Sequence, residues 1–311
     1  MSDQTNRGLI HLQEPISAIS VVIPCKNEEK AVGQTISDTR QALEGLSLNF
    51  EIIVVDDGSS DATAQEALDN GAMVLSHPIN QGYGNAIMNG ISVARYPVIA
   101  IMDADGTYPI DMLPKMIEMV GSHDMVVGQR IWERHNTARA NLLFRKILAY
   151  IIYYFTSVRS PDFNSGFRVF HKLDILSYRP LLCPTFSFTT SLTLIYLLLH
   201  RSVCFVPIDY STRVGSSKVS LLRDAIRTFA YVFLITNLFQ PYRLVLIFLA
   251  MAVVMNLLIM LAGSMAIITT AMQIYLQISA STFVLICVAG LLVMPLTKIY
   301  QQMFISKQTK N

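Results

Sequence analysis

Apolar and polar positions alternate in a regular order over the first half of the chain. Short runs rich in Val and Ile predict strands, and the segments between them, whose apolar residues recur at helical spacing, predict helices. The expected strands are residues 19–23, 51–55, 73–75, 98–102 and 125–129, and the expected helices are residues 29–43, 62–70 and 84–94. Strands that alternate with helices imply right-handed crossovers. We therefore expect an α/β domain with a mainly parallel sheet covered on both faces.

The hydropathy pattern changes in the last quarter of the chain. Residues 244–263 form an apolar run broken only by Asn256, residues 278–296 form a second run, and no residue from 244 to 296 is charged. A helix over the first run spans about 30 Å, the thickness of a bilayer core. Two buried core helices are the alternative, but uncharged runs of this length favour membrane spans. We expect a hairpin of two transmembrane helices.

Two further segments combine apolar and aromatic residues with basic ones. Residues 142–157 are too short and too basic to cross a bilayer, and residues 219–238 lead directly into the first apolar run. Both patterns suit helices that lie in the membrane interface, with ordinary domain helices as the alternative.

Basic residues lie near the two outer ends of the expected hairpin and not in the loop that connects its helices. Those nearest to its ends are Arg223, Arg227, Arg243, Lys298, Lys307 and Lys310, and the connecting loop has none. By the positive-inside rule both ends face the cytoplasm. The N-terminus lacks a basic segment followed by an apolar stretch, the pattern of a signal peptide. We therefore expect an integral protein of the inner or plasma membrane whose globular domain and both termini are cytoplasmic.

Composition adds little to this division. The 52% hydrophobic content exceeds that of most soluble proteins, the net charge of +2 excludes few partners, and no nucleic-acid-binding patch is visible. The four cysteines lack metal-like spacing and are interpreted as packing residues. The expected parts are a lead-in (1–17), a cytoplasmic domain (18–218), a juxtamembrane helix (219–240), the two spans (241–300) and a tail (301–311).

Candidate chemistry gathers where the expected strands end. Asp103 and Asp105 follow an apolar run and point the same way, so they repel each other unless a cation lies between them. Hard oxygen ligands favour a divalent cation that carries phosphate, although an isolated pair is as typical of a solvated turn. Two more polar clusters, at residues 26–28 and 56–57, end neighbouring strands, and ligands bind at such ends. Their convergence favours a nucleoside diphosphate site.

The acidic turn after residues 51–55 offers a second contact with a nucleotide. A carboxylate there accepts a hydrogen bond from a base N–H or a ribose hydroxyl. We favour Asp57 for this role over Asp56, and we interpret Ser59 and Asp61 as N-caps of the next helix.

Several motifs in order resemble the family 2 glycosyltransferases, inverting sugar-nucleotide enzymes with a Rossmann-like GT-A fold. The matching stretches are VVIPCKNE (21–28), VVDDGSSD (54–61), MDAD (102–105) and VGQR (127–130). DFNSGFR (162–168) and RVGSSK (213–218) resemble the branch that loads sugars onto polyprenyl phosphates. Dolichyl-phosphate mannose synthases and bacterial undecaprenyl-phosphate glucosyltransferases belong to it, and a C-terminal membrane hairpin fits the bacterial enzymes. The resemblance covers roughly residues 18–220.

The resemblance also implies site residues. It assigns a nucleoside pocket to Pro24, Lys26, Glu28, Val55 and Asp57. The nucleotide phosphates and a Mg²⁺ or Mn²⁺ ion fall to Asp103, Ala104 and Asp105, with the two aspartates as metal ligands. Two positions depart from the family pattern: Lys26 replaces a frequent aromatic residue, and Thr107 replaces a frequent Gln.

The implied acceptor is a lipid phosphate, which is already an anion and needs positive charge rather than a general base. Arg130, Arg213 and Lys218 are the expected catalytic cations, and the expected lipid-phosphate ligands are Arg130, Arg145, Arg168 and Arg213. Asp162 is interpreted as a residue that orients an arginine rather than one that removes a proton.

The expected function is metal-dependent transfer of a hexose from a nucleotide-sugar, UDP-glucose before GDP-mannose, to undecaprenyl or dolichyl phosphate. A transferase that acts on a lipid hydroxyl, with Asp162 as base, is one alternative. A non-catalytic nucleotide sensor or membrane scaffold is another. A processive polysaccharide synthase is disfavoured, because Trp132 lies outside a Gln-x-x-Arg-Trp motif. Asn256 and the small residues 262–264 leave a homo-oligomer open.

Overall fold

The computed structural model describes residues 16–131, 139–159, 162–211, 221–264, 269–286 and 289. For residues 139–145 and 221–224 it describes the backbone alone. The chain divides into two compact units, Met1–Tyr231 and Val232–Asn311.

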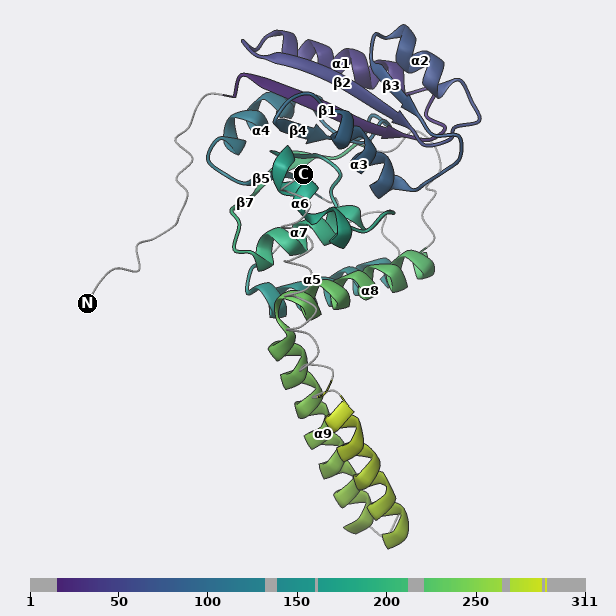
Figure 1. Cartoon of the computed structure of the whole chain (residues 1–311), viewed down its shortest axis with the longest axis vertical. Coiled ribbons are helices and arrows are strands. Elements are labelled where there is room, and N and C mark those ends of the chain that lie inside the picture. The colour runs from purple at the N-terminus through teal and green to yellow at the C-terminus, as the bar shows by residue number, and fades with distance from the viewer. Residues whose placement is uncertain are drawn as a thin grey trace, which may run out of the picture. The chain divides into compact units, whose positions relative to one another are not determined.

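The first unit is built on one mixed sheet (Figure 1). In the described part of the chain its strands are β1 (Ala18–Cys25), β2 (Asn49–Asp56), β3 (Met73–Ser76), β4 (Val98–Ile101), β5 (Met125–Ile131), β6 (Arg168–His171) and β7 (Val203–Asp209). They lie in the order β3-β2-β1-β4-β6-β5-β7. Parallel pairing joins β3, β2, β1 and β4, and also β5 and β7, whereas β6 runs antiparallel to both of its neighbours. The expected mainly parallel α/β sheet is confirmed.

Helices of the first unit cover both faces of this sheet. The labelled helices of the chain are α1 (Val32–Glu44), α2 (Thr63–Asp69), α3 (Tyr83–Val93), α4 (Leu113–Val120), α5 (Arg139–Thr156), α6 (Lys172–Tyr178), α7 (Phe188–Leu198), α8 (Leu221–Phe239) and, in the second unit, α9 (Pro241–Ser264). Helices α1 and α4 bury Ile36, Leu43 and Met116 against Val21 and Val54 of the sheet. On the other face α3 approaches closely, since a Cβ at Gly90 would lie 2.5 Å from Val22 Cγ1 and 2.9 Å from Val55 Cγ2.

Helix α7 is buried over all of its residues. Its Tyr196 hydroxyl is buried and has no hydrogen-bond partner among the described residues. An unpaired buried hydroxyl loses its water without compensation, so Tyr196→Phe is expected to raise the free energy of unfolding by about 1 kcal/mol. Thermal unfolding of the full chain in detergent measures this change.

Tyr108→Phe provides the opposite case. The Tyr108 hydroxyl accepts the Gly166 N–H at 2.8 Å, so its removal leaves a buried donor unpaired and is expected to lower the unfolding midpoint. Equal destabilisation by both substitutions would contradict the assignment for Tyr196.

The second unit contains α9, the described helix that is long and apolar enough to cross a bilayer, with a mean hydropathy of 2.9. A shorter apolar helix, Thr270–Ile286, packs beside it: the rings of Phe248 and Phe283 lie 6.0 Å apart and edge to face. The Asn256 amide donates to the Ala252 carbonyl oxygen at 2.9 Å, within its own helix.

The second expected span lies only partly within the described residues. The helix beside α9 begins at Thr270 rather than at residue 278, and it is described as far as Ile286. Most of residues 287–296, with Lys298, Lys307 and Lys310, lie outside the described residues. One candidate span is therefore established, and a hairpin of two spans is not.

Candidate functional site

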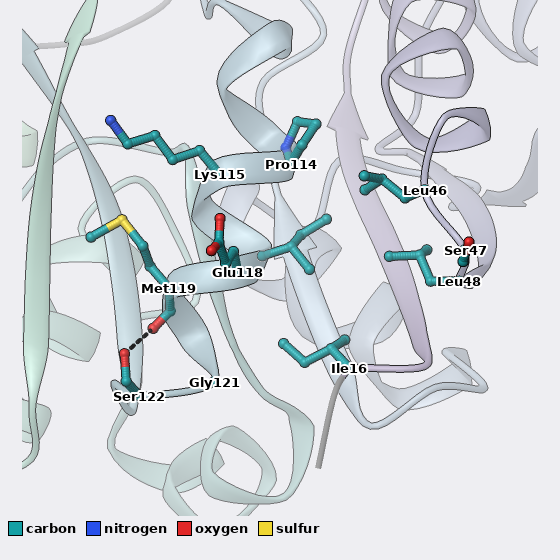
Figure 2. Close-up of a pocket in the computed structure, with 11 residues that line it drawn as sticks. Ile16, Leu46, Ser47, Leu48, Pro114, Lys115, Glu118, Met119, Gly121 and Ser122 are labelled. Atoms are coloured by element: carbon teal, nitrogen blue, oxygen red, sulfur yellow. Dashed lines mark hydrogen bonds between the residues drawn. The ribbon is translucent and has the colours of Figure 1, made fainter. Parts of the chain in front are cut away.

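One hollow in the described part of the domain lies away from the candidate residues. A groove of about 720 Å³ is lined by Ile16, Leu46 and Leu48 before β1 and β2, and by Pro114 and Met119 of α4 (Figure 2). It lies at the amino ends of the strands. None of the described candidate site residues lines it.

The candidate residues meet at the opposite edge, where the parallel strands end. Because β6 runs antiparallel, the segment that precedes it, residues 162–167, arrives at this same edge. Hydrogen bonds tie the loops after β1 and β2 together: Asn27 N donates to Ser59 Oγ, and Glu28 N donates to Thr63 Oγ1, both at 2.8 Å. Asp61 accepts from the Thr63 N–H at 3.1 Å but lies before Ala62, the N-cap of α2.

Two carboxylates follow β4, as the sequence predicts. Asp103 Oδ1 accepts the Tyr83 hydroxyl at 2.8 Å. Asp105 is buried, and its Oδ1 accepts from Thr107 Oγ1 at 2.6 Å and from Thr107 N at 3.3 Å. Between them Ala104 is also buried, and its carbonyl oxygen accepts from Thr35 Oγ1 at 3.1 Å. The turn is thus fixed on both sides.

The donor set of this turn fits a hard divalent cation. Both side chains are carboxylates, and Mg²⁺ and similar ions bind through one or two carboxylates together with substrate phosphates. Within the described ranges no group of three or more His, Cys, Asp or Glu residues surrounds a common point. A metal ion at Asp103 and Asp105 would therefore need oxygen atoms from a bound ligand.

Asp57 does not lie as we expect of a base-recognising residue. Its Oδ1 accepts the Gln81 N–H at 2.7 Å and contacts His77 Nδ1 at 2.8 Å, and its Oδ2 accepts the Gly82 N–H at 2.8 Å. Both oxygens are used to hold the segment that leads into α3. The neighbouring Asp56 accepts the Ser59 N–H with one carboxylate oxygen, at 3.0 Å.

The other residues of the expected nucleoside pocket divide by burial. Pro24 and Val55 are buried, and Val55 faces α3 rather than the site edge. Lys26 and Glu28 are half-buried in the loop after β1. Val55 therefore supports the fold beneath the site and offers a ligand no side-chain surface.

Arg130, at the end of β5, forms a bidentate pair with Asp162. Its Nε and one Nη donate to the two carboxylate oxygens at 2.7 and 2.9 Å, and the Asp162 side chain is only 2% exposed. The guanidinium also lies over the Tyr210 ring, 5.3 Å from its centroid. The expectation that Asp162 orients an arginine is confirmed by this geometry.

Burial and pairing act against each other in this pair. Burial alone lowers the pKa of Arg130, but the hydrogen bonds with Asp162 outweigh it, and the net shift of the pKa is upward. Burial alone raises the pKa of Asp162, but the hydrogen bonds from Arg130 lower it below its ordinary value. Both groups therefore stay charged at neutral pH, and Asp162 is poorly suited to remove a proton.

Arg168, expected to bind the lipid phosphate, is instead enclosed by protein. It is fully buried, and its guanidinium donates to the carbonyl oxygens of Ser165 and Phe163 at 2.7 and 2.8 Å and to Thr193 Oγ1 at 2.7 Å. Burial lowers the pKa of Arg168 to about 10, so it remains a cation at neutral pH. The structure corrects its role: Arg168 holds residues 163–165 against α7.

The side chains of the remaining candidate cations are not among those that the structure describes, so their roles stay predictions. Arg145 lies in residues 139–145 of α5, of which only the backbone is described. Arg213 and Lys218 lie in residues 212–220, outside the described residues.

Four further residues lie where the parallel strands end and were not among the predicted site residues: Tyr83, Tyr108, Tyr210 and Gly166. The Tyr108 ring lies 5.4 Å from those of Phe167 and Tyr210, and its hydroxyl accepts from Gly166. Burial, reinforced by the charge of Asp103, raises the pKa of Tyr83 and of Tyr108. Single aromatic residues in loops have no periodicity, so only the neighbouring motifs point to them.

Comparisons with known proteins bear on the family. The model of the family described as Glycosyl transferase family 2 matches residues 20–173. A dolichyl-phosphate hexose transferase of Haloferax volcanii is 30% identical over 213 residues, which are 65% of this chain and 86% of that relative. An undecaprenyl-phosphate 4-deoxy-4-formamido-L-arabinose transferase of Salmonella choleraesuis is 30% identical over 67% of this chain and 64% of the relative.

Coverage varies among the relatives. A low-salt glycan biosynthesis hexosyltransferase of Haloferax volcanii is 40% identical over 115 residues, but the chain spans only 27% of its length.

A solved structure of glucosyl-3-phosphoglycerate synthase from Mycobacterium tuberculosis, in complex with Mn²⁺, UDP and its product, shares the fold. Its TM-score is 0.58 at 20% identity, over 71% of this chain and 80% of the solved chain. Together with the extended match to the dolichyl-phosphate hexose transferase, this places the α/β domain in a GT-A-like fold. The chain is a glycosyltransferase and belongs to glycosyl transferase family 2.

Proposed function

We propose that this protein transfers a hexose from a nucleotide-sugar to a polyprenyl phosphate at the cytoplasmic face of a membrane. UDP-glucose is the favoured donor and GDP-mannose the second candidate, with undecaprenyl or dolichyl phosphate as the acceptor. The observation that carries the proposal is the convergence of a carboxylate pair, Asp103 and Asp105, with the paired Arg130 at one edge of the sheet. Two relatives are named for transfer to dolichyl phosphate and undecaprenyl phosphate.

At the donor end, Asp103 and Asp105 are the residues that would hold Mg²⁺ or Mn²⁺. Such an ion, when bound, neutralises the diphosphate that leaves. A GT-A neighbour is solved with Mn²⁺ and UDP-glucose, which supports this arrangement. Lys26 and Glu28 lie beside the turn as the candidate nucleoside contacts, with Asp56 now a better candidate than Asp57.

At the acceptor end, the transfer is a single displacement. An oxygen of the lipid phosphate attacks C1 of the hexose, the bond from C1 to the diphosphate breaks, and the electron pair leaves with the nucleoside diphosphate. One displacement inverts the configuration at C1. The nucleophile is already an anion, so the protein must supply positive charge, for which we propose Arg130 with Arg145, Arg213 and Lys218.

The Arg130–Asp162 pair favours a phosphate acceptor over a lipid hydroxyl. A hydroxyl needs a general base within hydrogen-bond reach, and Asp162 is the carboxylate that we considered for it. Because both Asp162 oxygens accept from Arg130 and its pKa is lowered, it is a poor base.

Two helices support the membrane location. In the most apolar stretch of helix α9 only 11% of the residues are buried, as expected for a helix that a bilayer surrounds. Helix α5 buries Leu148 and Ile152 in the domain while Tyr150 is 70% exposed. Further exposed apolar or aromatic side chains of α5 are Ile147, Tyr153 and Tyr154. An aromatic outer face of this kind suits the membrane interface.

Transfer of radiolabelled sugar tests the proposal directly. The full chain in detergent is incubated with undecaprenyl phosphate and either UDP-glucose or GDP-mannose, with Mn²⁺ or with EDTA. We expect a lipid-linked sugar that forms from one donor and requires the metal. If UDP or GDP binds in the presence of Mn²⁺ and no donor gives a product, transfer to this acceptor is ruled out. The nucleotide sensor then becomes the favoured function.

A further inference from the structure

The Asp103 carboxylate lies against the backbone of Gly166. A Cβ at residue 166 would be 2.9 Å from Asp103 Oδ2, 3.0 Å from Asp103 Oδ1 and 2.8 Å from the Tyr83 hydroxyl. Side chains do not tolerate such distances, so an added methyl group displaces the carboxylate or the hydroxyl. Asp103 and Tyr83 thus pack directly against the backbone of Gly166, in the space that a side chain would otherwise fill.

Hydrogen bonds hold the backbone of Gly166 and of the residues that precede it. The Gly166 N–H donates to the Tyr108 hydroxyl at 2.8 Å, and Arg168 holds the carbonyl oxygens of Phe163 and Ser165. Asn164 accepts from the Thr190 hydroxyl. With these bonds in place, the backbone at residue 166 cannot retreat from a larger side chain, and Asp103 must move instead.

The opposite side of the carboxylate is equally fixed. Tyr83 is the first residue of α3, and the preceding amides of Gln81 and Gly82 are held by Asp57. Gly84 has no room for a Cβ against the Pro184 backbone, at 2.8 Å. The Tyr83 hydroxyl therefore meets Asp103 from a helix start that has little freedom.

We propose that Tyr83 and Gly166 are positioning residues that set the orientation of the Asp103 carboxylate, and through it the affinity of the site for a metal-bound nucleoside diphosphate. The proposal rests on the donor half of the proposed function. Tyr83 directs one carboxylate oxygen by its hydrogen bond, and Gly166 leaves the space that this orientation needs.

Gly166→Ala and Tyr83→Phe test the proposal. UDP or GDP is titrated into the full chain in detergent with Mn²⁺ present, and the dissociation constant is measured by calorimetry. Loss of one hydrogen bond to a charged group weakens binding by about tenfold, the effect expected for Tyr83→Phe. We expect a loss of the same order for Gly166→Ala, with its thermal midpoint nearly unchanged, because the atoms that must move are the ends of side chains.

Matched controls separate positioning from general effects. Gly45→Ala adds a methyl group where nothing lies within 4 Å, and Tyr196→Phe removes a hydroxyl that has no partner among the described residues. Neither is expected to change nucleotide binding. The double variant of Tyr83 and Gly166 should lose less than the sum of the single losses, because both act on one carboxylate. Raising the Mn²⁺ concentration should restore transfer by Gly166→Ala.

The outcomes distinguish this proposal from the one on which it rests. If the wild-type protein binds neither UDP nor GDP with Mn²⁺, the proposed function fails and the positioning roles fail with it. If the wild type binds and Asp105→Asn does not, but both positioning variants bind as tightly as the wild type, only the roles of Tyr83 and Gly166 are overturned.

Discussion

Asp105→Asn is expected to reduce the rate of sugar transfer by about a thousandfold, since a metal ion on the leaving diphosphate contributes several kcal/mol of charge stabilisation. Asn keeps the shape and the oxygen that accepts from Thr107, at 2.6 Å in the wild type, while it removes the negative charge. The fold should therefore be retained. The measurement is formation of lipid-linked sugar at saturating donor and acceptor.

The control for this variant is Asp111→Asn, which removes a carboxylate from an exposed position six residues further along the chain. Full activity is expected there. Retention of more than a tenth of wild-type activity by Asp105→Asn would contradict a role for Asp105 at the metal-bound diphosphate.

Arg130→Met is expected to lower the free energy of unfolding by about 3–5 kcal/mol at pH 7, because it leaves a buried carboxylate without its partner. Asp162 is 2% exposed, and in the wild type both of its oxygens accept from Arg130. Transfer activity should fall as well, since the cation is lost from the acceptor end. Thermal unfolding of the full chain in detergent checks the first effect.

The pH dependence of this variant has a definite sign. In the wild type the pKa of Asp162 is lowered, so the pair stabilises the fold above the ordinary carboxyl pKa, and this stabilisation is lost as the pH falls through the lowered value. Without Arg130, burial raises the pKa of Asp162, and protonation removes the unpaired charge. The difference in the free energy of unfolding between the variant and the wild type should therefore be largest near pH 7 and shrink toward pH 5.

Arg201→Met is the matched control for Arg130→Met. Arg201 also bonds to two carboxylates, Asp124 at 2.9 Å and Asp174 at 3.3 Å, but its side chain is 35% exposed. Ion pairs of this kind contribute about 0–1 kcal/mol. If Arg201→Met lowered the free energy of unfolding as much as Arg130→Met, burial would not be the reason for the large effect at Arg130.

The first half of the fold was accessible from the sequence because its strands are short apolar runs and its helices carry apolar residues at helical spacing. Strands β1 to β5 and helices α1 to α3 show these patterns, with Gly, Asn or Asp near many of their ends. Helix α7 was missed since it is buried on all sides and shows no polar face. Strand β6 has four residues and includes Arg168 and His171, which read as surface until the partners of Arg168 are known.

The site was predictable where a motif ends a strand and not where roles depend on partners. Asp103, Asp105 and Arg130 lie at the expected edge. The sequence does not reveal that both carboxylate oxygens of Asp57 form hydrogen bonds with the amides before α3 and that one of them also contacts His77. Nor does it tell a buried arginine from one that faces a ligand, because the residue type is the same in both.

The reversed strand also bears on how the sheet is completed during synthesis. Strand β6 pairs with β4 on one side and with β5 on the other, and β5 in turn pairs with β7, the last strand of the sheet. Until residue 171 has left the ribosome, β4 has an open edge, and the first four strands form an incomplete half-sheet. Gly166 and Asp162 reach the site only with that insertion. A truncated product that ends before β6 would therefore carry both aspartates of the turn and yet expose an edge that favours aggregation.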